Sequence, residues 1–230
     1  MSLNSLYWIM FIGVAILSYI VQSSLQNKFN KFSKIRIANG MTGAEVAQKM
    51  LNDNGIHNVK ITHIQGQLTD NFNPTDMTLN LSDSVYGSCS VAAAAVAAHE
   101  CGHAVQHAKG YGPLKLRSAL VPAVSFASKA VTWILLLGML MVNVLPGVMG
   151  FGIALFALTT LFSIITLPVE VNASQRAVEW LNDAGITDYT NHEYACSALK
   201  SAAYTYVVAA LSSLATLIYY IMIFTSGNRR

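Results

Sequence analysis

The stretch SVAAAAVAAHECGHAVQHA, residues 90–108, predicts an alanine-rich helix that carries two histidines and a glutamate. Alanine favours helices more than any other residue, and Gly110 and Pro113 follow as residues typical of a helix end. His99 and His103 are four residues apart, so their imidazoles project from the same face of the helix. Two such nitrogens on adjacent turns are typical of a zinc site.

Glu100 supplies the second part of this pattern. At about 100° per residue, its side chain lies about 60° round the helix from that of His103. From there a carboxylate can accept a proton from water that a zinc ion activates. The alternative is a helix whose histidines only make polar contacts near a membrane surface, but the motif falls on a strongly predicted helix. Cys101 points to the far side of that helix and is a poor candidate ligand.

The composition around this helix indicates a membrane protein. Hydrophobic residues make up 53% of the 230 residues and charged residues 11%, against roughly 25% charged in an ordinary soluble domain. Four apolar stretches are long enough to cross a hydrocarbon core, which takes roughly 20 helical residues. They are residues 6–21 (extending to 3–25), 119–142, 148–167 and 203–224. Buried helices of a soluble core are the alternative, but a chain of this length cannot enclose four such helices.

Between the first two apolar stretches lies a polar module with local signals for helices and strands. Thr42 and Glu45 have the spacing of a capping box that opens a helix, and Asn54-Gly55 is typical of its end. Residues 58–64 and 77–81 are predicted strands, separated by turn residues. The module therefore combines helices with a small amount of strand.

After the third apolar stretch, Pro168 is expected to end the span, and residues 169–184 are expected to form a new helix. The short linker at residues 143–147 makes the second and third spans a tight hairpin. The predicted segments are 1–27 (N-terminal transmembrane anchor), 28–118 (module with the zinc helix), 119–168 (transmembrane hairpin), 169–202 (helical segment with the third zinc ligand) and 203–230 (C-terminal transmembrane helix and tail).

Basic residues predict the orientation in the membrane. Four of them follow the first apolar stretch at once: Lys28, Lys31, Lys34 and Arg36. Because no basic residue precedes that stretch, the positive-inside rule places the polar module with Ser84 in the cytoplasm and the hairpin at Pro146 outside. The Arg229-Arg230 tail would then lie outside, against the rule, but two terminal charges count for less than the cluster. The net charge of +3 is too small to indicate a nucleic-acid partner.

Several motifs together resemble the YugP-type neutral zinc metallopeptidases of bacteria. They are His99-Glu-Cys-Gly-His103 with Ala104 and Gln106, Val85 to Val91, Gly110 to Ser118, and Pro168 to Ser174. The segment from Glu170 to Ala173 more distantly resembles the glutamate motif of the HtpX-type membrane peptidases, in which that glutamate is the third zinc ligand. The resemblance implies zinc as the cofactor and hydrolysis of peptide bonds at a bacterial cell membrane. The implied roles are zinc ligand for His99, His103 and Glu170, and general base for Glu100.

The predicted topology also supports Glu170. A tight hairpin places the start of the second span and the end of the third span on the same side of the membrane. Glu170 follows the third span, and the zinc helix ends about ten residues before the second, which predicts that they lie close together. The alternative is a solvated carboxylate that interacts with the dipole at a helix start. Ser174 stands where the relatives usually carry aspartate, in a position from which a side chain can support the metal ligands.

Three further residues are candidates for contact with the substrate or the transition state: His107, Arg176 and His192. His107 lies one turn beyond His103, although a histidine at a helix C-terminus also interacts favourably with the helix dipole. Arg176 and His192 offer donors for the oxyanion that forms in peptide hydrolysis. For Arg176 the alternative is a salt bridge or a lipid headgroup.

The predicted fold class is mostly α, a polytopic membrane protein with about four transmembrane helices and a small zincin-like α+β module. Its predicted function is that of a membrane-embedded, zinc-dependent endopeptidase that acts on peptides or membrane proteins, with its active site near the cytoplasmic surface of the lipid bilayer. A membrane scaffold or sensor that binds zinc without turnover is the alternative. Glu100 argues against it, because metal binding alone needs no carboxylate there. A zinc-dependent hydrolase of non-peptide substrates also fits the sequence, which does not indicate an oligomeric state.

Overall fold

A computed structural model describes residues 3–227 of the chain, so the Arg229-Arg230 tail lies outside the described residues. The chain forms two compact units, each assembled from segments that are far apart in the sequence. Unit 1 consists of Met1–Ile20, Lys115–Leu167 and Tyr206–Arg230, and unit 2 of Val21–Leu114 and Pro168–Thr205. The division into five consecutive segments stays a prediction.

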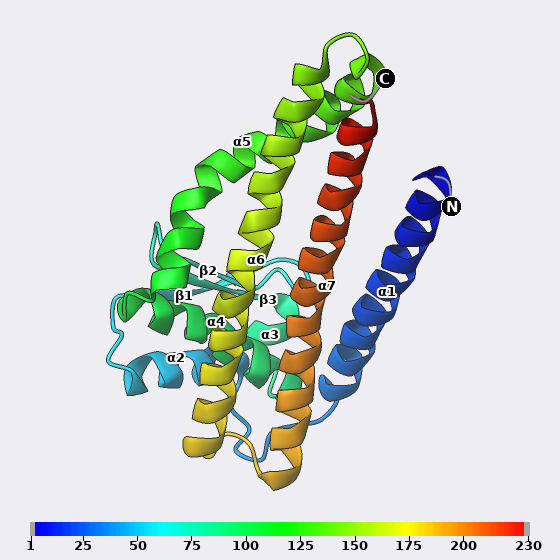
Figure 1. Ribbon diagram of the computed structural model, residues 1–230. Helices are drawn as coiled ribbons and strands as arrows, with labels where there is room; N and C mark the ends of the chain where they lie inside the picture. Colours follow the sequence, from blue (N-terminus) through cyan, green and yellow to red (C-terminus); the bar gives the residue numbers. More distant parts are fainter. Residues whose placement is uncertain (1–2, 228–230) are drawn as a thin grey trace. The chain divides into compact units, whose positions relative to one another are not determined.

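Among the described residues, four helices are long and apolar enough to cross a membrane, as the sequence predicts (Figure 1). They are α1 (Leu3–Phe32), α5 (Gly112–Met141), α6 (Pro146–Asp183) and α7 (Tyr189–Gly227). Each contains nearly all of one predicted apolar stretch and is longer than that stretch. A helix satisfies its backbone hydrogen bonds internally, which is why apolar stretches adopt it in a bilayer. The predicted fold class, mostly α with four candidate spans, is confirmed.

The prediction that Pro168 ends the third span is wrong. Helix α6 continues through Pro168, so Glu170 lies inside a long helix instead of at the start of a new one. Proline removes one backbone hydrogen bond and can kink a helix, but packing of the flanking turns keeps the helix continuous. Val169 and Ala173, both 0% exposed, provide that packing after the proline.

In unit 1, helices α5 and α6 form a hairpin whose backbones approach closely. A Cβ atom at Gly138 of α5 would lie 2.7 Å from Cα of Met149 in α6, so glycine is required at this contact. Small residues are typical of contacts between membrane helices, whose association depends on close packing. The linker lies where the sequence predicts it, because α5 ends at Met141 and α6 begins at Pro146.

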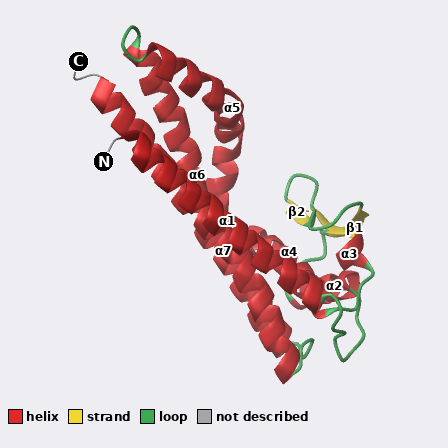
Figure 2. Cartoon of the chain, turned by 90° about the vertical axis from the view of Figure 1, so that its right-hand side faces the viewer, coloured by secondary structure: helices red, strands yellow, loops and turns green. Residues whose placement is uncertain are grey.

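Unit 2 contains the polar module, in which a small sheet accompanies the helices (Figure 2). Its elements are α2 (Gly43–Asp53), β1 (Lys60–Ile64), β2 (Asn71–Asn73), β3 (Thr78–Ser82), α3 (Asp83–Tyr86) and α4 (Val91–Ala108). The strand order is β1-β3-β2, with β1 parallel and β2 antiparallel to β3, so β2 is an edge strand. The two predicted strands correspond to β1 and β3. Strand β2 has little signal in the sequence, because Asn71-Phe72-Asn73 is short and lacks β-branched residues.

Helix α4 packs against α2, α3 and the sheet within unit 2. It begins after Ser90, whose hydroxyl accepts a hydrogen bond from the N–H of Ala93. It ends before Gly110, whose φ of 64° is a left-handed conformation that glycine adopts without strain. The many buried alanines of α4 let neighbouring elements approach it on several sides.

The predicted capping box of α2 is present as well, with reciprocal hydrogen bonds between Thr42 and Glu45.

Candidate metal centre

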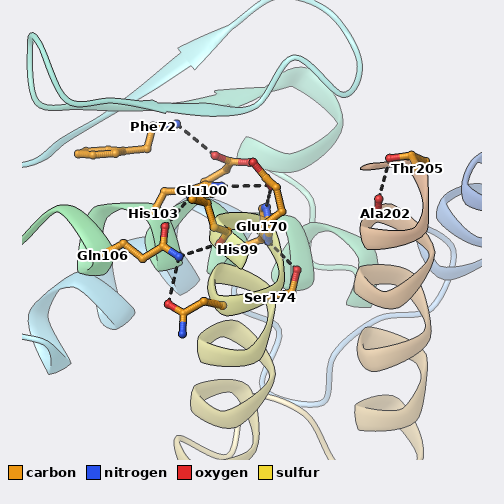
Figure 3. A network of polar contacts seen from close by, with 11 residues as sticks. Phe72, His99, Glu100, His103, Gln106, Glu170, Ser174, Ala202 and Thr205 are labelled. Atoms are coloured by element: carbon orange, nitrogen blue, oxygen red, sulfur yellow. Dashed lines mark hydrogen bonds and ion pairs between the residues drawn. The ribbon is translucent and has the colours of Figure 1, made fainter. Parts of the chain in front are cut away.

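Three side chains of unit 2 converge on one point in the structure (Figure 3). His99 and His103 project from adjacent turns of α4, and Glu170 reaches them from α6. Oε2 of Glu170 lies 3.3 Å from Nε2 of His99 and 3.5 Å from Nε2 of His103. All three donor atoms lie within 4.8 Å of one another. The structure therefore brings together the three residues that the resemblance implies as ligands.

This donor set fits a zinc ion. Zinc binds imidazole nitrogens and carboxylate oxygens at roughly 2.0–2.2 Å in tetrahedral geometry, which separates neighbouring donor atoms by roughly 3.4 Å. The distances of 3.3 and 3.5 Å from Glu170 Oε2 agree with that separation. Three protein ligands also leave a fourth position for water or substrate, which is the arrangement of catalytic zinc sites.

Helix α6 comes close to α4 because both helices carry small residues at their contact. A Cβ atom at Gly102 would lie 2.6 Å from the backbone oxygen of Ala173, closer than real side chains come. Ala173 and Ala177 are 0% exposed, so this side of α6 faces the core of unit 2. Gly102 lies between the two histidines in the sequence, and Ala173 lies one turn from Glu170. The contact therefore sets the distance between the ligands on the two helices.

Gly102→Ala is expected to weaken zinc binding, because the added methyl group must push α6 and Glu170 away from α4. Overpacking of this kind costs about 1–3 kcal/mol of stability. The measurements are zinc content after dialysis and the midpoint of thermal unfolding. Gly87→Ala is the matched control, since a Cβ atom there meets nothing within 4 Å. Zinc binding by Gly102→Ala equal to that of the wild type would show that this contact does not position Glu170.

Glu100 lies beside the metal cluster but is held by a different partner. Its Oε2 accepts a hydrogen bond of 3.1 Å from the backbone N–H of Phe72 in β2, and the residue is only 9% exposed (Figure 3). Burial disfavours the charged carboxylate and raises the pKa of Glu100 above its usual value, against the opposite effect of the neighbouring histidines. A carboxylate with a raised pKa is better suited to exchange a proton near neutral pH.

The second ring nitrogen of each histidine is also engaged. Nδ1 of His103 lies 3.1 Å from Oε1 of Gln106, and Nδ1 of His99 lies 3.1 Å from Oγ of Ser174. Such contacts hold the rings in place and leave Nε2 to face Glu170. Ser174 thus contacts a histidine of the cluster.

Two of the further candidates lie close to residues of the site. The ring of His107 packs against that of Phe72, with 5.8 Å between the centroids, next to the backbone group that contacts Glu100. Arg176 does not join the metal cluster; its Nε donates a hydrogen bond of 2.8 Å to Oδ1 of Asn172. His107 therefore lies next to the strand residue that contacts Glu100. Arg176 reaches the site only through the side chain of Asn172.

His192 and Cys101 have other surroundings. Nδ1 of His192 lies 3.1 Å from the hydroxyl of Thr187, and its Nε2 lies 3.4 Å from the sulfur of Cys196. Cys101 is buried, and its Sγ donates to the backbone oxygen of Ala47 at 3.5 Å. Burial raises the pKa of the Cys101 thiol well above its ordinary value, which disfavours the thiolate that metal binding requires. Within the described residues, neither side chain belongs to the metal cluster.

Three groups of the site have no assigned role in the sequence-based interpretation: the N–H of Phe72 and the side chains of Gln106 and Asn172. Gln106 lies three residues after His103 on a largely apolar helix, and a polar residue at that spacing is a usable signal. The contribution of Phe72 is a backbone group, and its position depends on the packing of β2. No sequence pattern identifies it.

Comparisons with known proteins agree with this geometry. Residues 7–225 match a protein family described as "Putative neutral zinc metallopeptidase". The chain is 41% identical over 212 residues to a Bacillus subtilis (strain 168) protein described as "Putative membrane protease YugP". That similarity covers 92% of this chain and 93% of the relative. The search of solved structures gave no match.

Proposed function

The chain belongs to this family of neutral zinc metallopeptidases, and from that premise we propose that it is a zinc-dependent endopeptidase of the bacterial cell membrane. Its proposed substrates are peptides or membrane proteins. The observation that carries the proposal is the cluster of His99, His103 and Glu170 with the buried carboxylate of Glu100 beside it. Ligands and base have separate positions, as hydrolysis with a metal and a general base requires.

In the proposed mechanism, His99, His103 and Glu170 would hold the metal, since Nε2 of each histidine faces Oε2 of Glu170. The Lewis-acid chemistry that a zinc ion would supply there polarises a carbonyl group and makes water more acidic. Glu100 accepts a proton from the attacking water on a carboxylate oxygen and then delivers it to the nitrogen of the leaving amine. The N–H of Phe72 orients the carboxylate of Glu100 for both transfers.

The edge strand β2 favours a peptide over a non-peptide substrate. An edge strand presents backbone N–H and C=O groups with which an extended peptide can pair. Because the N–H of Phe72 faces Glu100, a peptide that lies along β2 would pass the proposed base. The ring of His107, packed on that of Phe72, is in position to contact the side chains of such a peptide.

Glu100 also favours an enzyme over a scaffold or sensor that only binds zinc. Burial of a carboxylate is unfavourable, and the three ligands hold the metal without it. The test is an assay of the purified protein in detergent on fluorogenic peptides, with Glu100→Gln as the inactive reference. A wild-type protein that holds zinc but cleaves no faster than this variant would support the scaffold.

We also propose that the polar module, with Ser84, faces the cytoplasm and that the hairpin at Pro146 lies outside, on the charge asymmetry around the first span. A cysteine at Gln67, an exposed position of the module, should then resist impermeant thiol reagents in intact cells. A cysteine at Val144, which is 79% exposed in the hairpin linker, should react. The background replaces the native cysteines Cys89, Cys101 and Cys196. Both positions should react in lysed cells, and the reverse pattern in intact cells would contradict the orientation.

A further inference from the structure

We propose that Gln106, Asn172 and Arg176 are positioning residues that set the tautomer of His103, so that its Nε2 is available to the metal. The inference rests on the proposed metal site and extends it by three residues that are not themselves metal ligands. Gln106 lies on α4, and the other two lie on α6, all within unit 2.

Gln106 is the centre of this network because it is a fully buried polar side chain, 0% exposed. A buried amide must find partners for its oxygen and for both N–H groups, because an unpaired polar group costs about 1–3 kcal/mol. Its Nε2 lies 2.7 Å from the backbone oxygen of Val169 and 3.1 Å from Oδ1 of Asn172. Its Oε1 lies 3.1 Å from Nδ1 of His103 (Figure 3). All three polar groups of the amide are therefore paired.

The partner at Val169 determines which way the amide of Gln106 faces. A backbone carbonyl accepts hydrogen bonds and never donates them, so the nitrogen of Gln106 must face Val169. The oxygen of the amide must then face His103, and an amide oxygen also only accepts. Nδ1 of His103 therefore carries the proton. In a neutral imidazole with the proton on Nδ1, the lone pair is on Nε2, the atom that faces Glu170.

Asn172 and Arg176 constrain the amide of Gln106 a second time. Nε of Arg176 lies 2.8 Å from Oδ1 of Asn172, and a guanidinium group can only donate. Asn172 must therefore present its oxygen, and the same oxygen accepts the second N–H of Gln106. The hydrogen bonds form a connected series from Arg176 to His103 in which every donor and acceptor is determined. Arg176 thus acts on the site through Asn172 and Gln106 and does not itself belong to the metal cluster.

His99 lacks this constraint and provides an internal comparison. Its Nδ1 lies 3.1 Å from the hydroxyl of Ser174, which can either donate or accept. Ser174 holds the ring of His99 without selecting its tautomer. The two histidines of the cluster therefore depend on their partners in different ways, and only for His103 does the partner fix a proton on Nδ1.

Gln106→Leu is expected to lower the affinity for zinc by about 10- to 100-fold, the usual range for loss of an outer-shell partner. The affinity is measured on the purified full-length protein in detergent by competition with a chromophoric chelator. A second readout is the Nδ1–H proton resonance of His103 in zinc-saturated protein with nitrogen-labelled histidine. The buried hydrogen bond to Gln106 should protect this proton from exchange in the wild type, and the resonance should disappear in Gln106→Leu.

Variants of Asn172 keep the test decisive if Gln106→Leu fails to fold. Asn172→Ala should lower the zinc affinity less than Gln106→Leu, because Val169 still holds the amide of Gln106. Asn172→Asp keeps the acceptor oxygen and should restore the wild-type affinity. Ser174→Ala is the matched control, since it removes the partner of the other histidine and should leave the His103 resonance in place.

Two results would overturn the proposal. Wild-type affinity in both Gln106→Leu and Asn172→Ala, with the His103 resonance retained, would show that these residues do not set the tautomer. Equal losses in Asn172→Ala and Asn172→Asp would have the same consequence, because the acceptor would then be irrelevant. A wild-type protein that binds no zinc would instead overturn the proposed function, and the role of these residues with it.

Discussion

Replacing Glu100 with glutamine is expected to lower kcat for peptide hydrolysis by about 100- to 10,000-fold while zinc stays bound. Glutamine has nearly the shape of glutamate, and its side-chain oxygen can still accept the N–H of Phe72. It cannot take up the proton that must leave the attacking water. Zinc content should not change, because Glu100 contributes no donor atom to the metal cluster. The measurements are initial rates on a fluorogenic peptide and the amount of zinc per chain.

Glu179→Gln is the matched control for this variant. It makes the same chemical change at an exposed position of α6, and it should leave both the rate and the zinc content unchanged. Turnover of Glu100→Gln close to the wild-type rate would rule out Glu100 as the general base. Loss of zinc from the variant would mean that Glu100 binds the metal instead.

Glu170→Ala is expected to remove most of the zinc affinity, well beyond the roughly 10- to 100-fold that loss of an outer-shell partner costs. The carboxylate is 3% exposed, and its Oε2 lies within 3.5 Å of both imidazole Nε2 atoms. Its removal leaves two neutral nitrogen donors, where a catalytic zinc site needs three protein ligands. The measurements are the zinc Kd from chelator competition and the zinc content after dialysis.

His107→Ala is the comparison for Glu170→Ala. His107 lies one turn beyond His103, but its ring packs on Phe72 and it does not belong to the metal cluster. Its removal should leave zinc binding unchanged. If Glu170→Ala keeps its zinc and His107→Ala loses it, the site is a three-histidine one and the assignment of Glu170 is wrong.

Features that depend on near neighbours in the chain could be predicted from the sequence. The helix of residues 90–108 corresponds to α4, and the capping box at Thr42 and Glu45 opens α2. The four apolar stretches all lie in long helices. In each case the deciding interactions are within one helix turn or within one apolar segment, so their pattern is visible in the sequence.

Two features that depend on more distant packing differ from the local signals in the sequence. Pro168 has a local preference to end a helix, but α6 continues because the next turn is buried in unit 2. Strand β2 forms although two of its three residues are asparagines, which are depleted in strands, because β3 provides the pairing partner. In both places tertiary contacts outweigh a local preference.

From the sequence alone, the candidate groups for the chemistry could be identified, since the helical period places His99 and His103 on one face with Glu100 beside them. Its hydrophobic content and the length of its apolar stretches determined the number of candidate spans. How Glu170 reaches the two histidines and how the N–H of Phe72 reaches Glu100 become visible in the tertiary structure alone. Those distances depend on how closely α6 and β2 pack against α4. Gly102 contacts the α6 backbone closely, so this packing depends on how the surfaces of two helices fit together. Local sequence patterns do not contain that information.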